Sequence, residues 1–233
     1  MPRFLLSLPL AALVTVGVGV ASLVVGFARP GGRAPRRLER VWARTLLRLW
    51  GVDVLVSGAQ NVPHGPAVFA ANHASVLDIP LLFGYLPAEF RIVHKRSLYL
   101  LPVIGLYLYV AGHIGIDRAN PFRARRSLSR AAGRIAGGES VVLFPEGTRS
   151  RDGTVRPFKK GSFVIALEAG VPVVPVSLGG VRHLTPRGLL RLRAGTVRLA
   201  VHEAISTTGR GLDHARALAE ETRTIVSLGC ATA

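Results

Sequence analysis

Cysteine, lysine and acidic residues are all scarce in this sequence. The only cysteine among the 233 residues is Cys230, close to the C-terminus. One thiol excludes a disulfide framework and a CxxC zinc site, and its position argues against an acyl-cysteine intermediate in the core. The chain has 13 acidic and 30 basic residues. Three of the basic residues are lysines, so arginine supplies most of the net charge of +17. Such an excess indicates polyanionic partners: nucleic acid, anionic lipid headgroups or phosphorylated substrates.

Motifs for two other functional classes are missing as well. Aromatic residues make up 6% of the chain and no nucleic-acid-binding motif is present, which disfavours a basic nucleic-acid binder. No GxSxG sequence occurs, so a serine nucleophile on a strand-to-helix elbow is excluded. Hydrophobic residues make up 49% of the chain and its mean hydropathy is +0.37, which argues against disorder over most of the length.

The N-terminal segment 4–28 contains no charged residue. A helix of 25 residues is long enough to cross a bilayer core of about 30 Å. A cleaved signal peptide is one alternative, although its apolar region is normally about 7–15 residues long. Another is a segment that enters the bilayer and turns back, because Pro9 and several glycines weaken a straight helix. The arginines that follow predict that the rest of the chain is cytoplasmic: Arg29, Arg33, Arg36 and Arg37.

Segment 38–50 combines a basic stripe with apolar and aromatic residues. Arg40, Arg44 and Arg48 recur every four residues, and Trp42 and Trp50 are among the residues between and after them. This pattern predicts a helix in the headgroup region of a membrane, with an ordinary amphipathic helix packed on the domain as the alternative. We therefore expect residues 1–50 to form membrane-anchoring and interfacial helices and residues 51–233 to form a separate globular domain.

From Gly51 onward, strand-like and helix-like stretches alternate. The predicted strands are 52–57, 67–71, 140–144, 171–178 and 196–203, and the predicted helices are 75–86, with Ser75 as its N-cap, 121–135 and 161–169. This order predicts a single α/β domain with a mostly buried sheet flanked by helices. The apolar stretch 98–110 is short and broken by Pro102 and Gly105, so we interpret it as core or as a wall facing an acyl chain.

The first polar loop reads Asn72-His73-x4-Asp78 and follows a predicted strand. Histidine titrates near neutrality and is the usual general base for a hydroxyl, while a carboxylate on its far ring nitrogen fixes the tautomer. Residues five apart on one helix diverge by about 140°. The pair therefore meets only if His73 precedes the helix and Asp78 lies in its first turn. Taken alone, the spacing is weak evidence and favours the alternative, a surface histidine and a helix-start aspartate.

Two further loops carry charges after predicted strands. Arg118 lies in Gly115-Ile116-Asp117-Arg118, and Arg149 ends Phe144-Pro145-Glu146-Gly147-Thr148-Arg149, with Lys159 shortly beyond. These three cations are able to converge on one phosphate. The alternative for residues 146–149 is a turn with a local ion pair.

The blocks AANHASVLDIP, GIDRAN, FPEGTRS and VPVVPV, in this order and spacing, resemble the four conserved blocks of the glycerolipid acyltransferase family. The similarity extends from about residue 52 to residue 203. Within the family it is strongest to bacterial, membrane-bound 1-acyl-sn-glycerol-3-phosphate acyltransferases.

The resemblance implies transfer of an acyl chain from acyl-CoA or acyl-ACP to a glycerol hydroxyl, giving phosphatidic acid for phospholipid synthesis. His73 would be the general base and Asp78 would orient it. Substrate contacts fall on Asn72, Arg118, Glu146, Gly147, Thr148, Arg149 and Lys159. Pro172 and Pro175 of the fourth block are linked to donor binding or to packing. Neither a metal nor a redox cofactor is implied.

Three functional hypotheses follow from these patterns. The leading one is acylation of lysophosphatidic acid at the cell membrane, with the catalytic domain on the cytoplasmic side. The second keeps the chemistry and changes the acceptor to glycerol-3-phosphate, another lysophospholipid or a lyso-aminolipid. The third is a membrane-tethered, non-catalytic binder of nucleic acid or anionic lipid. Acyl-chain length and the choice between CoA and carrier protein stay open.

Overall fold

The computed structural model describes residues 2–28, 34–101, 104–117, 120–150, 152–186 and 192–231. These residues contain one seven-stranded sheet with the strand order β1-β7-β6-β2-β5-β3-β4. The strands are β1 Val52–Ser57, β2 Val68–Ala71, β3 Arg91–Lys95, β4 Ile114–Ile116, β5 Val141–Leu143, β6 Val173–Gly179 and β7 Gly195–Val201. All neighbours pair in parallel except β6 and β7, so β1 and β7 run opposite to the other five strands.

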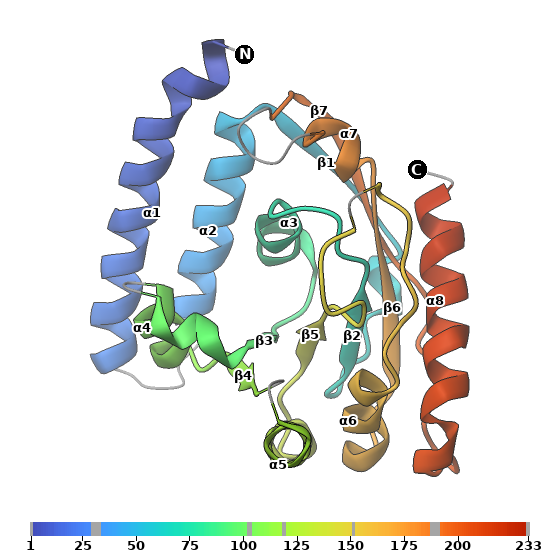
Figure 1. The fold of residues 1–233 in the computed structure, drawn as a ribbon. Coiled ribbons are helices and arrows are strands. Elements are labelled where there is room, and N and C mark those ends of the chain that lie inside the picture. Colours follow the sequence, from blue (N-terminus) through green and yellow to red (C-terminus); the bar gives the residue numbers. More distant parts are fainter. Residues whose placement is uncertain are drawn as a thin grey trace.

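Helices cover both faces of this sheet (Figure 1). The α-helices are α1 Pro2–Ala28, α2 Ala34–Leu49, α3 Asp78–Tyr85, α4 Ile104–Val110, α5 Pro121–Ala136, α6 Gly161–Ala169, α7 Val181–Leu184 and α8 Ala215–Ala231. The short 3-10 helices are η1 Ala59–Asn61, η2 Arg96–Leu100 and η4 Leu212–His214. Phe69 and Ala71 of β2 face the core under α2 and α3, whereas Val68 and Ala70 face the core under α5, α6 and α8. The predicted α/β fold with a buried sheet is confirmed.

Several predicted elements have the expected bounds and capping. Strand β1 and helix α6 agree with the prediction at both ends, and α5 begins at Pro121 as expected. The side chain of Asn120 caps α5 by accepting hydrogen bonds from the backbone N–H groups of Phe122 and Arg123. Proline at the first helical position lacks the N–H that would be unpaired there. These elements are therefore determined by local signals in the chain.

Helix α3 begins later than predicted. Its first residue is Asp78, and Ser75 lies in the preceding turn instead of at the N-cap. The Ser75 hydroxyl accepts a hydrogen bond from the Leu77 N–H. The backbone N–H groups of Ala74 and Ser75 both donate to the Asp78 carboxylate, which holds residues 74–77 in a turn. Because these hydrogen bonds fix residues 74–77 as a turn, the helix begins only at Asp78.

In the described residues of the stretch 98–110, most of the large apolar side chains are solvent-exposed, with Leu100 84% and Tyr109 74% exposed. The interpretation as core is therefore wrong, and a wall facing an acyl chain stays a prediction. The sequence pattern also missed β3, β4 and α8. Strand β3 begins with Arg91, which is buried and donates to the carbonyl of Ala111, so a core strand opens on a charged residue. Tertiary contacts of this kind are invisible to local hydrophobic periodicity.

Helix α1 is long and apolar enough over residues 7–27 to cross a membrane, by length and composition. The apolar side of α2 is buried against the domain through Ala43 and Leu47. The burial supports the alternative of an amphipathic helix packed on the domain. Whether the arginine side of α2 also lies in headgroups stays a prediction, as does the domain division at residue 50.

Candidate active site

The predicted His–Asp pair is present at the carboxyl end of β2. His73 lies in the loop after this strand, and Asp78 is the first residue of α3. The imidazole Nδ1 lies 2.7 Å from Asp78 Oδ2. This is the arrangement that the helical geometry required. Because Nδ1 is engaged by the carboxylate, Nε2 is the ring nitrogen that can accept a proton from a hydroxyl.

Three donors meet on a single oxygen of Asp78. Oδ2 lies 2.8 Å from the backbone nitrogens of both Ala74 and Ser75, in addition to its contact with His73. The Asp78 side chain is fully buried. Its other oxygen, Oδ1, has no hydrogen-bond partner among the described residues. The three hydrogen bonds to Oδ2 offset part of the cost of burying this side chain.

Glu146 holds the histidine loop from the neighbouring strand. It follows β5, which pairs with β2 in parallel, so their carboxyl ends meet at one edge of the sheet. One carboxylate oxygen accepts the His73 N–H at 2.7 Å and the other accepts the Arg156 N–H at 3.2 Å. Burial raises the pKa of Glu146 above its ordinary value, although the two hydrogen bonds oppose that shift. Both oxygens are used inside the protein, which indicates a positioning role.

Two further contacts fix the imidazole, and the sequence pattern assigned neither. The ring of Phe144 stacks on that of His73, with centroids 4.0 Å apart and an angle of 20°. The carbonyl of His73 accepts a hydrogen bond from the Ser150 N–H. Phe144 directly follows β5, whose last residue pairs with Ala70 of β2, so it lies at the same edge of the sheet as the His73 loop. An aromatic residue next to a strand end is a common pattern, and by itself it gave no signal of this contact.

Asn72 is committed to the sheet. Its side-chain nitrogen donates to the carbonyl of Leu178 at 3.1 Å, and its side-chain oxygen accepts from the Leu178 N–H at 2.8 Å. The residue is buried, and the contacts tie the end of β2 to β6. These hydrogen bonds support a role in placing His73 and do not support the predicted direct contact with a substrate.

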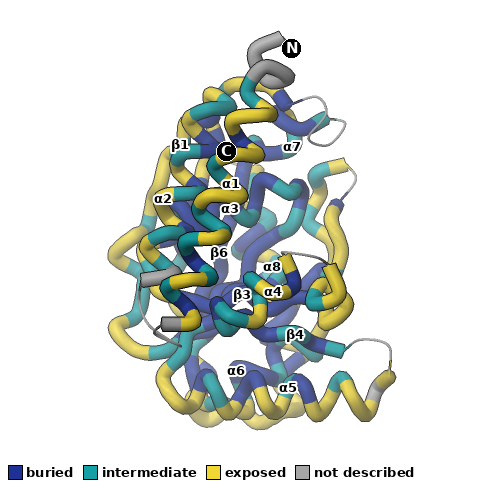
Figure 2. Tube along the Cα trace, turned by 90° about the vertical axis from the view of Figure 1, so that its left-hand side faces the viewer, coloured by how far each residue is buried: buried dark blue, intermediate teal, exposed yellow. Residues whose placement is uncertain are grey.

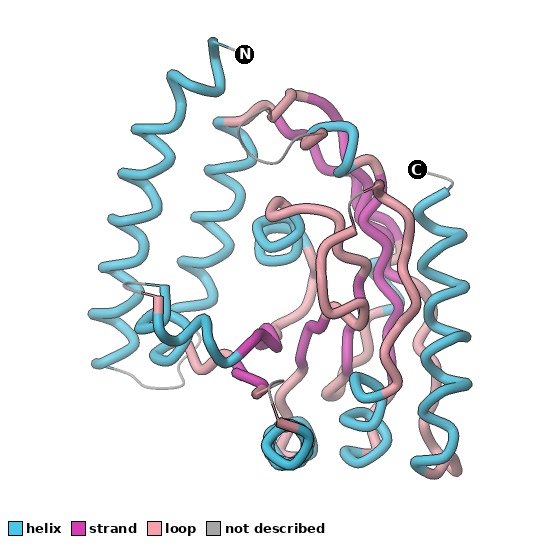
Figure 3. The backbone as a smooth tube through the Cα atoms, viewed as in Figure 1, coloured by secondary structure: helices cyan, strands magenta, loops and turns pink. Residues whose placement is uncertain are grey.

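Gly147 and Lys159 lie together in the loop between β5 and α6, which runs beside the sheet (Figure 3). Gly147 has φ of 75°, and a Cβ built on it would lie 2.9 Å from Lys159 Nζ. The glycine therefore supplies a left-handed backbone and makes room for the ammonium. Its N–H donates to the Phe144 carbonyl at 3.1 Å, so this amide closes the turn. The oxyanion of a tetrahedral intermediate in acyl transfer would therefore have to take its hydrogen bonds from donors other than the Gly147 N–H.

The remaining predicted contacts lie in the turn after β5, in the second block and in the fourth block. Thr148 and Arg149 are exposed on the same turn as Glu146 and Gly147. Arg118 lies outside the described residues, so its predicted convergence with Arg149 and Lys159 stays a prediction.

Of the fourth block, Pro175 lies in β6, between β2 and β7, and its carbonyl accepts a hydrogen bond from the His202 N–H. Pro175 therefore lies in an interior strand, and its link to donor binding or to packing stays a prediction.

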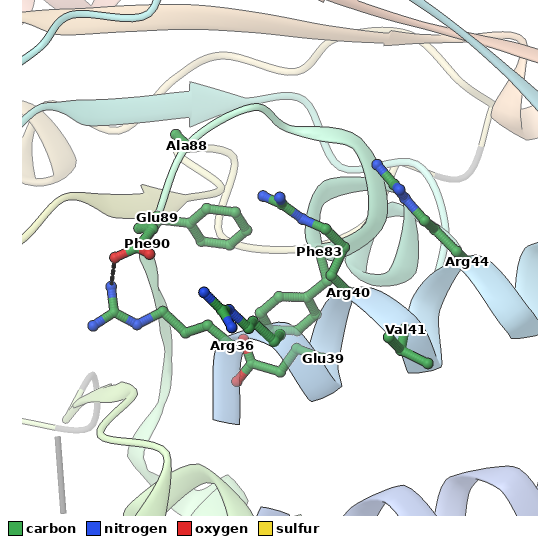
Figure 4. Close-up of a pocket in the computed structure, with 10 residues that line it drawn as sticks. Arg36, Glu39, Arg40, Val41, Arg44, Phe83, Ala88, Glu89 and Phe90 are labelled. Carbon is green, nitrogen blue, oxygen red and sulfur yellow. Dashed lines mark hydrogen bonds and ion pairs between the residues drawn. The ribbon is translucent and has the colours of Figure 1, made fainter. Parts of the chain in front are cut away.

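Two hollows lie beside these elements. The first, of about 350 Å³, lies between α2 and the α3–β3 connection, and Figure 4 shows arginines of α2 around it. Arg36 pairs there with Glu89, and Arg44 donates to the Gly84 carbonyl near the end of α3, so part of this charge holds α2 to the domain. The second, of about 830 Å³, lies at the carboxyl ends of β3 and β4 and is lined by Lys95 and Asp117, among others. Among the described residues, none of the predicted site residues lines either hollow.

The profile of the acyltransferase family matches residues 53–179 of the chain. A 1-acyl-sn-glycerol-3-phosphate acyltransferase of Chlamydomonas reinhardtii is 38% identical over 205 residues, which cover 87% of this chain and 60% of the algal protein. The corresponding enzyme of Borreliella burgdorferi is 33% identical over 175 residues, which cover 72% of this chain and 70% of that protein. The chain spans 60% or less of the first curated relatives from Chlamydomonas reinhardtii, Brassica napus and Arabidopsis thaliana.

A solved structure resembles the whole fold. The crystal structure of the 1-acyl-sn-glycerophosphate acyltransferase PlsC from Thermotoga maritima superposes with a TM-score of 0.80. It shares 30% sequence identity with this chain, and the match covers 99% of this chain and 92% of that one. The likeness therefore includes the N-terminal helices as well as the sheet and the loops at its carboxyl edge.

Proposed function

The chain belongs to the acyltransferase family, and from this premise we propose that it acylates the sn-2 hydroxyl of 1-acyl-sn-glycerol-3-phosphate. The donor is an acyl thioester of coenzyme A or acyl carrier protein, and the product is phosphatidic acid. The observation that carries the proposal is the buried Asp78 carboxylate 2.7 Å from His73 Nδ1. The acceptor is the one for which the related acyltransferases are named.

In the proposed reaction, His73 Nε2 removes the proton of the acceptor hydroxyl as the oxygen attacks the thioester carbonyl carbon. The Asp78 carboxylate stabilises the imidazolium that forms. The carbon–sulfur bond of the tetrahedral intermediate then breaks, and the imidazolium returns its proton to the leaving thiolate. The thioester is already activated, so the enzyme needs no covalent acyl intermediate. The hydrogen bonds from His73 N–H and Ser150 N–H keep the loop in place during both proton transfers.

The acceptor phosphate is assigned to Lys159 and Arg149, together with Arg118, which lies outside the described residues. Support comes from the place of Lys159 Nζ beside Gly147, next to the residue that holds the His73 N–H. A lysine supplies a compact charge and an arginine a bidentate fork, and both suit phosphate oxygens. The positive charge near the base also favours an acceptor that bears a phosphate over a neutral one.

We assign the protein to a membrane, with α1 embedded in one leaflet. Trp42 of α2 donates to Thr15 of α1 at 3.1 Å, so the middles of the two helices lie side by side. If α1 crossed the bilayer upright, the exposed Arg40 and Arg44 would reach its centre, at a cost of about 2.5–3.5 kcal/mol for each arginine. An α1 lying near the plane of one leaflet keeps these arginines at headgroup level on the cytoplasmic side.

The test is acyl transfer by the full chain in lipid vesicles, with a His73→Ala variant. Loss of a general base is expected to reduce turnover by about 10²–10⁴-fold. His64→Ala is the matched control, since His64 is an exposed histidine on a loop away from β2's carboxyl end, and it should retain activity. Undiminished turnover in His73→Ala would remove the mechanism. Crossing both donors with several acceptors decides the substrate, and preference for another lysophospholipid would replace the proposed acceptor.

A further inference from the structure

A second apolar surface lies on the α1 side of the molecule. Helix α4 packs against α1, and a Cβ on Gly26 would collide with the side chain of Val110. Figure 2 views the molecule from this side and shows exposed residues in yellow along its helices. Large apolar side chains of η2, α4 and the turn between them are exposed, and we call them the η2–α4 surface: Leu98, Leu100, Leu101, Ile104, Leu106 and Tyr109. A cluster of this kind on a soluble face is uncommon without a partner.

The η2–α4 surface is held on a firm support. The Gly105 N–H donates to the Leu101 carbonyl at 2.8 Å, and a Cβ on Gly105 would collide with the Tyr99 carbonyl oxygen, so η2 and α4 are in close contact. The Tyr99 hydroxyl donates to the His113 carbonyl at 2.7 Å and accepts from Gly115 N–H at 3.1 Å, which anchors η2 to β4. The exposed leucines are therefore presented by backbone contacts that do not depend on burying them.

Cations border these apolar residues. The hollow of about 830 Å³ is lined by Leu100 and Tyr109 of the η2–α4 surface and by four basic residues: Lys95, Arg96, Arg130 and Arg134. Arg134 is paired with Glu139, and Asp117 is among the lining residues, so the net positive charge around the hollow is smaller than the count of basic residues suggests. A strip of exposed apolar side chains next to lysine and arginine matches the boundary between acyl chains and anionic headgroups.

We propose that the η2–α4 surface is a second membrane contact, which enters the acyl region of the same leaflet as α1 while the bordering cations meet anionic headgroups. Its contact with α1 and the charge beside it favour a lipid surface over another protein. The inference rests on the proposed membrane association of α1. Together, the two contacts would fix the rotation of the domain about α1, and they would bring the carboxyl edges of β3 and β4 to the headgroup level.

The experiment places a fluorophore at single positions of the full chain in vesicles of phosphatidylcholine and phosphatidylglycerol. Burial raises the pKa of the Cys230 thiol to about 11, and replacing this only cysteine by alanine leaves a background without thiols. Cysteine is then introduced by Leu100→Cys in η2, Leu13→Cys in α1 or Leu228→Cys in α8. Leu13 and Leu228 are exposed, and α8 lies on the opposite side of the sheet from α1 (Figure 1).

Lipids with a nitroxide on the acyl chain are expected to quench the probes at positions 13 and 100 several-fold more than the probe at 228. Quenching at 13 with a position-100 signal equal to that of 228 would overturn this inference and leave the α1 assignment intact. The absence of quenching at both 13 and 100 would overturn both. A probe at 100 that is shielded from water but not quenched would mean that protein, such as a second copy of the chain, covers the surface.

A kinetic comparison tests the same surface without a probe. The double variant Leu100→Gln/Leu106→Gln should raise KM for an acceptor in vesicles several-fold and leave kcat unchanged. It should not alter KM for a short-chain acceptor dissolved in water. The matched control, Leu212→Gln/Leu228→Gln, removes two exposed leucines from the other side of the molecule. An equal change in both double variants would contradict the proposal.

Discussion

Asp78 combines two functions, because the same carboxylate oxygen binds the imidazole and organises the turn before α3. Its three donors are His73 Nδ1 and the backbone N–H groups of Ala74 and Ser75. A neutral amide of the same shape can accept from the two backbone groups but cannot stabilise an imidazolium by its charge. Stability and catalysis should therefore separate when the carboxylate is replaced by an amide or is removed altogether.

We expect Asp78→Asn to lower kcat at least about a hundredfold while the free energy of unfolding changes little. Asp78→Ala should lose the same activity and also destabilise the fold by about 1–3 kcal/mol for each buried N–H left unpaired. Acyl transfer and urea unfolding in detergent measure the two quantities. Full activity in Asp78→Asn would show that the negative charge is not required.

Glu146 gives the fold a pH dependence that can be worked out from its burial. Its pKa is raised above the ordinary value of 4.5 chiefly by desolvation, so the folded state holds this proton more tightly than the unfolded state. The stability that this proton provides is complete below pH 4.5 and is lost as the pH rises through the raised pKa.

We expect the unfolding free energy of the wild type, relative to that of Glu146→Gln, to fall as the pH rises from 4.5 through the raised pKa of Glu146. Above that pKa the difference should level off. The amide does not titrate, so the difference between the two proteins isolates the carboxyl group. Urea unfolding of both proteins on each side of the ordinary glutamate pKa measures it. A relative stability that increases with pH would mean that the hydrogen bonds from His73 and Arg156 outweigh burial.

At the level of helices and strands, the sequence predicted best those elements whose ends are marked by capping residues, proline or glycine. Asn120 and Pro121 mark the start of α5, and Gly170 adopts a left-handed conformation at the end of α6. The start of α3 was misplaced because the Asp78 side chain takes backbone donors before the helix begins. Strand β3 was missed because its first residue, Arg91, is a buried cation bound to a distant carbonyl.

The candidate site also contains contacts that the local sequence predicted and contacts that it did not predict. The spacing of His73 and Asp78 specified the geometry needed for contact, and that geometry is present. The stacking of Phe144 and the hydrogen bonds of Asn72 to Leu178 depend on which strands are neighbours. Strand order is set by long-range pairing, for which a local pattern carries no information.

Helix α2 shows how far an amphipathic pattern can be interpreted. Its apolar side was predicted, but the pattern does not say whether lipid or protein covers it. Leu47 is completely buried among the residues packed on the domain, while Val41 on the same helix is exposed. The helix therefore contributes to the core of the domain as well as connecting it to α1.

We expect Leu47→Ala to destabilise the domain by about 2–5 kcal/mol, the usual cost of such a truncation in a core. Val41→Ala should change stability by less than about 0.5 kcal/mol, because an exposed valine loses few contacts. Thermal unfolding of both variants in the same detergent provides the comparison. Equal and small effects would mean that the domain begins after residue 50, as the sequence suggested, and folds without α2.

Over the whole molecule, a net charge of +17 and an apolar α1 act on membrane binding in different ways. A basic residue near an anionic surface contributes about 1 kcal/mol, and the interaction fades beyond a Debye length of about 10 Å at 0.1 M salt. Burial of apolar surface is not screened in this way. Charge should therefore govern how fast the protein arrives at a membrane, and α1 should govern whether it stays.

We expect the association rate with anionic vesicles to fall steeply as salt rises towards about 1 M, where the Debye length is about 3 Å. Neutral vesicles serve as the control and should show a slower rate with little dependence on salt. Protein already bound should remain on both kinds of vesicle during a wash at high salt, because α1 is embedded. Stopped-flow energy transfer measures the rate, and vesicle flotation measures retention. Release by salt alone would mean that arginine contacts hold the protein on the surface and that α1 does not enter the leaflet. An association rate with equal salt dependence on both kinds of vesicle would show that headgroup charge does not guide the encounter.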